Sequence, residues 1–96
     1  MKLLEIQREI KSKRKFREGT YSIVVDLENP GDEFQEFLRV NVMEDGKQVA
    51  KAIFKQWKPD GRWEPLSITV QEPNKRKSLR EMIYNAASSA GFFLKD

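Results

Sequence analysis

Residues 48–57, QVAKAIFKQW, decide the fold that we expect for this chain. Small or apolar side chains at Ala50, Ala52 and Phe54 alternate with Lys51 and Lys55, which is the period of a strand with one buried face and one exposed face. An Asp-Gly pair stands on each side of this stretch, at 45–46 and 60–61, and such pairs are typical of hairpin turns. The stretch is therefore predicted to be a strand, joined by hairpins to a strand on either side.

Three further stretches have strand character, at 20–27, 34–43 and 63–71, and Asn29-Pro30-Gly31-Asp32 is a turn between the first two. At the start of the chain, Leu3, Ile6 and Ile10 share one helical stripe within residues 2–15. Near its end, Ser78 and Glu81 have the spacing of a capping box, and Gly91 stands where the helix should stop.

These elements predict an α+β fold of order α-β-β-β-β-α. A four-stranded antiparallel meander lies between two helices, and the C-terminal helix packs on one face of the sheet. We expect a single domain over 1–96, with a basic N-terminal helix or arm at 1–18, the sheet at 20–71 and the C-terminal helix at 76–91.

The loop lengths decide which side chains share a face. Two-residue loops would bring Lys51 and Lys55 onto the apolar face, where their charge would be costly to bury. We therefore expect three-residue loops, with Met43 facing Lys47 and Trp57 facing Trp63. The apolar face then holds Tyr21, Ile23, Val25, Leu27, Leu38, Val40, Val42, Ala50, Ala52, Phe54, Leu66, Ile68 and Val70.

The composition argues against catalysis. The 96 residues include no Cys and no His, which excludes disulfides, zinc sites built on these ligands and Ser-His-Asp triads. Asp26, Glu28, Asp32 and Glu33 surround a turn without EF-hand spacing, so we expect a solvated acidic loop rather than a metal site. We predict that the protein is not an enzyme and has no cofactor, no metal and no small-molecule substrate.

The cellular compartment is predicted from the lack of long apolar segments in the sequence. Glu5 and Arg8 interrupt any signal-peptide core, and no apolar run approaches the ~20 residues of a membrane span. We expect an intracellular, cytoplasmic protein that does not act at a membrane.

The charge is unevenly distributed along the chain, although the net charge is only +3. Residues 1–18 carry seven Lys or Arg and three Glu, whereas residues 19–46 carry one Arg and seven acidic residues. Residues 47–64 are basic again, with five cations and two acids. Such segregation is compatible with a solvated charged surface, and equally with a basic surface that meets a polyanion.

The second face of the sheet combines aromatic, cationic and hydrogen-bonding side chains. Aromatic rings stack on unpaired bases, and Lys and Arg contact phosphates. We therefore predict a sequence-tolerant protein that binds single-stranded DNA or RNA without catalysis. The predicted contact residues are Phe37, Arg39, Lys51, Lys55, Trp57, Lys58, Arg62 and Trp63, together with Lys13, Arg14, Lys15 and Arg17 of the basic arm.

Other interpretations of these residues remain open. Trp57 and Trp63 could be a cross-strand pair that stabilises the hairpin. Leu3, Ile6 and Ile10 of the N-terminal helix could cover Phe37, Val49 and Ile53. The same face could also be the seam of a homodimer or a protein-interaction surface.

One run of elements in the second half of the chain has the order of a known family. It consists of AIFKQW at 52–57, the turn at 59–61, WEP at 63–65 and the strand LSITV at 66–70. Over about residues 34–90 this order resembles the transcriptional positive-cofactor-four family and its Whirly relatives. The resemblance implies a homodimer that binds single-stranded DNA or melted duplex through its sheet faces. By this resemblance, the binding residues of the family correspond to Lys51, Lys55, Trp57 and Trp63 of this chain. In place of the family's Lys-Lys-Gly approach to the last strand, this chain has Pro65-Leu66.

Overall fold

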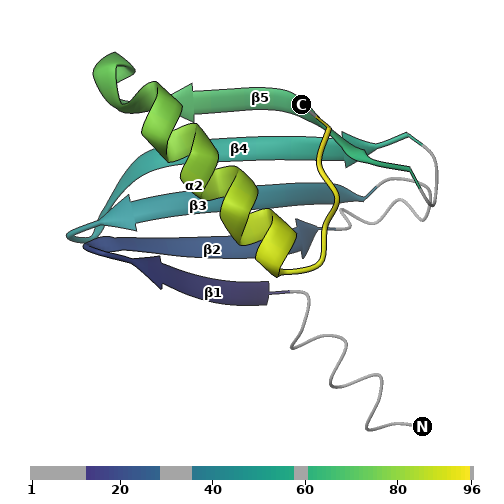
Figure 1. Cartoon of the computed structure of the whole chain (residues 1–96), viewed down its shortest axis with the longest axis horizontal. Coiled ribbons are helices and arrows are strands. Elements are labelled where there is room, and N and C mark those ends of the chain that lie inside the picture. Colours follow the sequence, from purple (N-terminus) through teal and green to yellow (C-terminus); the bar gives the residue numbers. More distant parts are fainter. Residues whose placement is uncertain (1–12, 29–35, 58–60, 96) are drawn as a thin grey trace, which may run out of the picture.

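A computed structural model of the chain describes residues 13–28, 36–57 and 61–95. Its strands are β1 (Lys13–Glu18), β2 (Tyr21–Glu28), β3 (Phe37–Glu44), β4 (Lys47–Gln56) and β5 (Trp63–Val70). They form one antiparallel sheet in the order in which they occur along the chain. A 3-10 turn, η1 (Pro73–Lys75), leads into α2 (Arg76–Ser89), which crosses one face of the sheet diagonally (Figure 1).

The α+β class and the antiparallel meander are confirmed, but the predicted four strands and N-terminal helix are wrong. Residues 13–15, which the prediction placed in that helix, belong to β1, and residues 1–12 lie outside the described part of the chain. Strand pairing explains β1 better than a helix does, because Phe16 lies opposite Ile23 and packs against the core. Gly19 has a φ of 61° at the first position of the two-residue turn to β2, where a type II′ hairpin turn requires glycine.

The turn between β3 and β4 has two residues, not the predicted three. Asp45 and Gly46 both have positive φ, 51° and 77°, as a type I′ turn demands, and Glu44 pairs with Lys47. Such a turn alone would have reversed the faces of β4. The register shifts between Val42 and Met43, so Val49 is an extra residue and the predicted faces are restored.

A second shift, between Ile53 and Phe54, changes the start of β5. Ile53 pairs with Ser67 but Phe54 pairs with Pro65, which leaves Leu66 as the extra residue. Leu66 is half exposed instead of buried on the apolar face. Trp63 pairs with Gln56 rather than facing Trp57, so its ring lies on the helix side of the sheet.

The core lies between the sheet and α2. Among the described residues, fourteen buried apolar side chains form it, and most are those expected from the alternation: Ile23, Val25, Leu38, Val40, Val42, Ala50, Ala52, Phe54, Trp63, Leu79, Met82, Ile83, Ala86 and Ala87. Phe54 meets the ring of Tyr84 edge to face, with centroids 5.7 Å apart. No buried polar or charged residue is found in the described part of the chain.

Both ends of α2 follow from local hydrogen bonding. The helix begins at Arg76, two residues before the predicted cap, and the Ser78 hydroxyl donates to the Lys75 carbonyl rather than capping free amides. It ends at Ser89, and Gly91, the predicted stop, follows the cap residue Ala90 with a φ of 97°. The amides of Gly91 and Phe92 donate to the carbonyls of Ser88 and Ala87, the pattern of a Schellman motif.

The residues after α2 return to the sheet and pair with β5 (Figure 1). The Trp63 amide donates to the Phe93 carbonyl and the Lys95 amide donates to the Trp63 carbonyl, both at 2.8 Å. Phe92 meets the Trp63 ring edge to face at 5.7 Å. This pairing covers the start of an edge strand and explains why Trp63 is buried.

Candidate nucleic-acid interface

The face of the sheet opposite α2 is called the open face, because no described element lies on it. Alternation places every second strand residue there, and the register aligns these residues in rows across the strands. One row is Lys13, Asp26, Arg39, Ile53 and Ser67, and the next is Lys15, Val24, Asn41, Lys51 and Thr69. Polar and charged side chains thus dominate the middle of the face.

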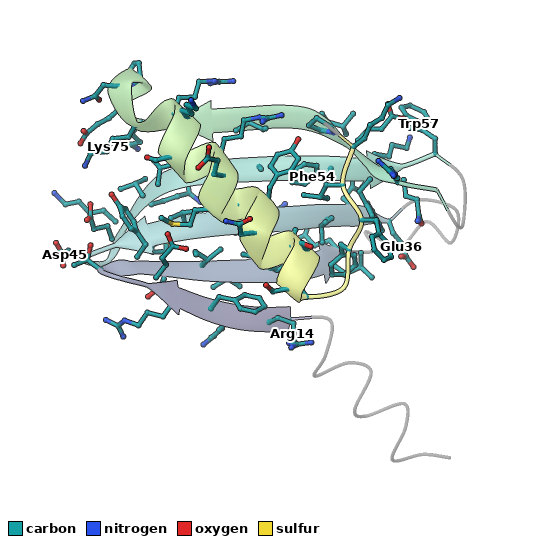
Figure 2. The ribbon with its side chains drawn as sticks, in the orientation of Figure 1. Arg14, Glu36, Asp45, Phe54, Trp57 and Lys75 are labelled. Carbon is teal, nitrogen blue, oxygen red and sulfur yellow. The ribbon has the colours of Figure 1, made fainter. Side chains whose placement is uncertain are left out.

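Phe37, Lys55 and Trp57 meet at one end of the open face and are called the aromatic corner. Lys55 lies opposite Phe37, and its Nζ is 6.0 Å from the centroid of the Phe37 ring and 4.2 Å from that of Trp57. Trp57 is 61% exposed and lies at the opposite end of the sheet from Asp45 (Figure 2). Cation–π contact with Lys55 holds the Trp57 ring at the surface while leaving most of it in solvent.

Lys13, Lys15 and Arg17 project from β1 onto the open face and are called the basic strip. They pair with Asp26, Val24 and Ser22, which are open-face residues of β2, and all three are exposed. Cations on an edge strand also discourage pairing with another chain. The prediction of a basic N-terminal arm named these three residues, and β1 brings them to the same face as the aromatic corner.

Carboxylates moderate the positive charge of the open face. Arg39 forms an ion pair with Glu28 at 2.8 Å, and both side chains are more than a third exposed. Asp26 lies between Lys13 and Arg39 in its row, and Glu64 lies opposite Lys55. The described strands place six cations and three carboxylates on this face, so its balance is positive.

Two amides add hydrogen-bonding capacity beside Lys51. The Gln48 amide donates to Oδ1 of Asn41 at 2.6 Å, and Asn41 lies opposite Lys51. The bulge at Val49 is what turns Gln48 onto this face, so its role could not be read from simple alternation. Half-buried Val24 and Ile53 fill the space between these polar groups.

Three predicted contact residues in the described part of the chain are not among these open-face residues. Trp63 is only 5% exposed and lies on the helix side, which overturns its predicted role in stacking. Arg14 also faces the helix side, opposite Val25, and its guanidinium is 5.9 Å from the Phe16 ring centroid. Arg62 is exposed just before β5, and Lys58 lies outside the described residues.

The described residues contain no group of three or more Asp or Glu side chains placed to hold a metal ion. Asp32 and Glu33 of the acidic turn lie outside the described part.

Across the described ranges, no helix has the length and apolar character needed to cross a membrane. Away from the open face, Glu72, with a smaller effect of Tyr21, raises the pKa of Lys75 above its ordinary value.

Comparison of the chain with protein-family models, with curated proteins and with solved structures gave no match. The resemblance to the positive-cofactor-four family therefore stays a prediction.

Proposed function

We propose that the protein binds single-stranded nucleic acid on its open face, with little sequence preference and without catalysis. The observation that carries this proposal is the convergence of the aromatic corner and the basic strip on one face, opposite the core. Bases stack on Trp57 and Phe37, and phosphates contact the basic strip and Lys51. Rings and ammonium groups recognise features that all nucleotides share.

The arrangement favours a single strand over a duplex. The rings of the aromatic corner need unpaired bases, whose flat faces a duplex hides within its stack. Neighbouring strands lie about 4.8 Å apart, so the basic strip is about 14 Å from β4. A flexible single-stranded nucleic acid can cross the β-strands over that distance and contact both the aromatic corner and the basic strip.

The cation–π contact of Lys55 with Trp57 fits the same role. Lys55 occupies one side of the ring in the free protein, so a base would use the side that stays in solvent. The ammonium group then lies across the ring from the stacked base, where it can contact a neighbouring phosphate of the ligand. One side chain would thus orient the ring and neutralise the ligand.

Titration with oligothymidine tests this proposal, with tryptophan fluorescence as the readout. The signal should come from Trp57, because Trp63 is buried against Phe92. We expect quenching that disappears in Trp57→Phe, a variant that keeps an aromatic ring for stacking. Absence of any binding at low ionic strength would disprove the proposal.

Two double charge-reversal variants, one on each face of the molecule, test which face binds the nucleic acid. Lys51→Glu with Lys55→Glu should abolish binding, because it places negative charge on the open face. Arg76→Glu with Lys77→Glu changes the net charge equally but on exposed residues of α2, on the other face, so binding should change little. Equal effects of the two double variants would contradict an open-face site.

A second candidate function is association through the same face. Val24 and Ile53 are half-buried aliphatic side chains in its middle, and such groups favour contact with another protein surface. The predicted homodimer would use them. Light scattering with and without oligonucleotide distinguishes the two, because an open-face dimer must dissociate or rearrange when the ligand binds.

A further inference from the structure

The surface next to Trp57 continues around the sheet edge to the helix side as two shallow hollows. The first, of about 270 Å³, is lined by Trp57, Gly61, Arg62, Glu64 and Lys95. The second, of about 290 Å³, is lined by Arg62, Tyr84, Ser88, Phe92, Phe93 and Leu94. Arg62 belongs to both, so the two hollows meet at this residue.

Phe93 is the most exposed large apolar side chain in the described part of the chain, at 77%. Its neighbours are both anchored, since Phe92 packs on Trp63 and Leu94 bridges to the same residue. The Phe93 carbonyl accepts a hydrogen bond from the Trp63 amide at 2.8 Å. The backbone is therefore fixed while the ring stands in solvent, and the fold does not need the ring.

The walls of the second hollow are suited to a nucleotide. Phe93 offers an aromatic surface, and Arg62 offers a guanidinium group that can bind phosphate in two-pronged fashion. Tyr84 is fixed by Arg80, whose guanidinium lies 4.4 Å from the ring centroid and 3.2 Å from the hydroxyl. Ser88 adds a hydroxyl at the rim.

We propose that this hollow is an additional subsite for the same single strand of nucleic acid, in which Phe93 stacks a base several nucleotides away from the base on Trp57 and Arg62 binds a phosphate of the connecting nucleotides. The inference rests on the proposed function and extends its site beyond the open face. Arg62 lines both hollows and therefore connects them. A single-stranded nucleic acid that leaves the aromatic corner past Arg62 enters the second hollow directly. Exposed aromatic side chains at both ends, Trp57 and Phe93, mark the two ends of this path.

The test compares Phe93→Ala with wild type on labelled oligothymidines of about four and about twelve nucleotides, by fluorescence anisotropy. Loss of one stacked base should weaken binding of the long oligonucleotide about fivefold or more. The short one, held at the aromatic corner, should bind within about twofold of wild type. Leu66→Ala is the matched control, because Leu66 is also an exposed apolar side chain of the β5 edge but lines neither hollow.

A second pair of variants tests the phosphate contact. Arg62→Gln should weaken the long oligonucleotide and lower the salt dependence of its binding, whereas Arg76→Gln should do neither. If Phe93→Ala binds the long oligonucleotide like wild type, the subsite is disproved while the open-face site stands. If wild-type protein binds neither oligonucleotide, the proposed function fails. Equal weakening of both lengths by Phe93→Ala would also contradict a separate subsite.

Discussion

Trp57 and Trp63 are the same residue type six positions apart, and their surroundings give them different roles. Trp57 is 61% exposed beside Lys55, whereas Trp63 is 5% exposed beside Phe92. A base can reach the first ring but not the second. Binding and stability should therefore depend on different tryptophans.

Alanine substitutions make this difference measurable. Trp57→Ala should lower oligonucleotide affinity by about 1–3 kcal/mol and leave the free energy of unfolding within about 0.5 kcal/mol. Trp63→Ala should lower the free energy of unfolding by about 3–5 kcal/mol, because it leaves a cavity beside Phe92 and Leu94. Urea unfolding followed by circular dichroism checks both values. A large loss of stability in Trp57→Ala would show that its ring belongs to the fold.

Among the elements, β4 is the one whose geometry determines the site. Its two-residue turn and the bulge at Val49 have opposite effects on the alternation, and together they keep Lys51 and Lys55 on the open face. A regular strand after the same turn would have buried both lysines. The bulge also turns Gln48 toward Asn41.

Deleting residues tests the bulge directly. Removing Val49 should leave a regular hairpin with the same faces, at a cost of about 1–2 kcal/mol from its lost packing and its hydrogen bond to the Gln71 amide. Removing Val24 from β2, whose pairings contain no bulge, should unfold the protein, because half of that strand would reverse its faces. Thermal unfolding by circular dichroism distinguishes the two. A folded Val24 deletion would contradict this account.

Alternation was enough to predict most of the sheet, but not its irregularities. Burial of Val25, Val40 and Ala52 follows from period two together with the cost of burying lysine. The cost of burying lysine determines which side chains of β4 are exposed, but it does not determine the length of the turn before β4. A two-residue turn followed by a bulge exposes the same side chains as a three-residue turn. Trp63 was misplaced for this reason: a second bulge at Leu66 reverses its face, and no local pattern marks that bulge.

The first strand was missed for a different reason. Its residues, KRKFRE, contain a single apolar side chain, so neither strand nor helix periodicity is visible. The available signal was Gly19, which fits the first position of a tight hairpin turn before Tyr21. Recognising that turn would have placed Lys13, Lys15 and Arg17 on the open face, and Arg14 on the other.

At the scale of the whole molecule, one face of the sheet holds the core and the other holds the proposed site. Five open-face cations, Lys13, Lys15, Arg17, Lys51 and Lys55, are not in an ion pair with another described residue. Binding of phosphates by three to five of them releases the corresponding counterions from a single strand.

The salt dependence of binding should report this number. We expect the logarithm of the association constant to fall with the logarithm of salt concentration with a slope of about −2 to −3.5. The Lys13→Gln, Lys15→Gln and Arg17→Gln triple variant should reduce the slope by about 2. The same titrations at pH 6 and pH 8 should give nearly the same slope, because without His no open-face side chain is of a type that ordinarily changes its charge in that interval. A slope near zero would show that phosphates are not contacted.

The order of strands in the sheet, in which each pairs only with its neighbours along the chain, also bears on how the molecule reaches its native state. Hairpins close short loops, so the entropy lost before each pairing is small, and folding should be faster than in sandwiches with crossed connections. The hairpin of β3 and β4, with its tight turn, is suited to form in the transition state. The contact between Trp63 and the residues after α2 joins distant parts of the chain, so we expect it to form last.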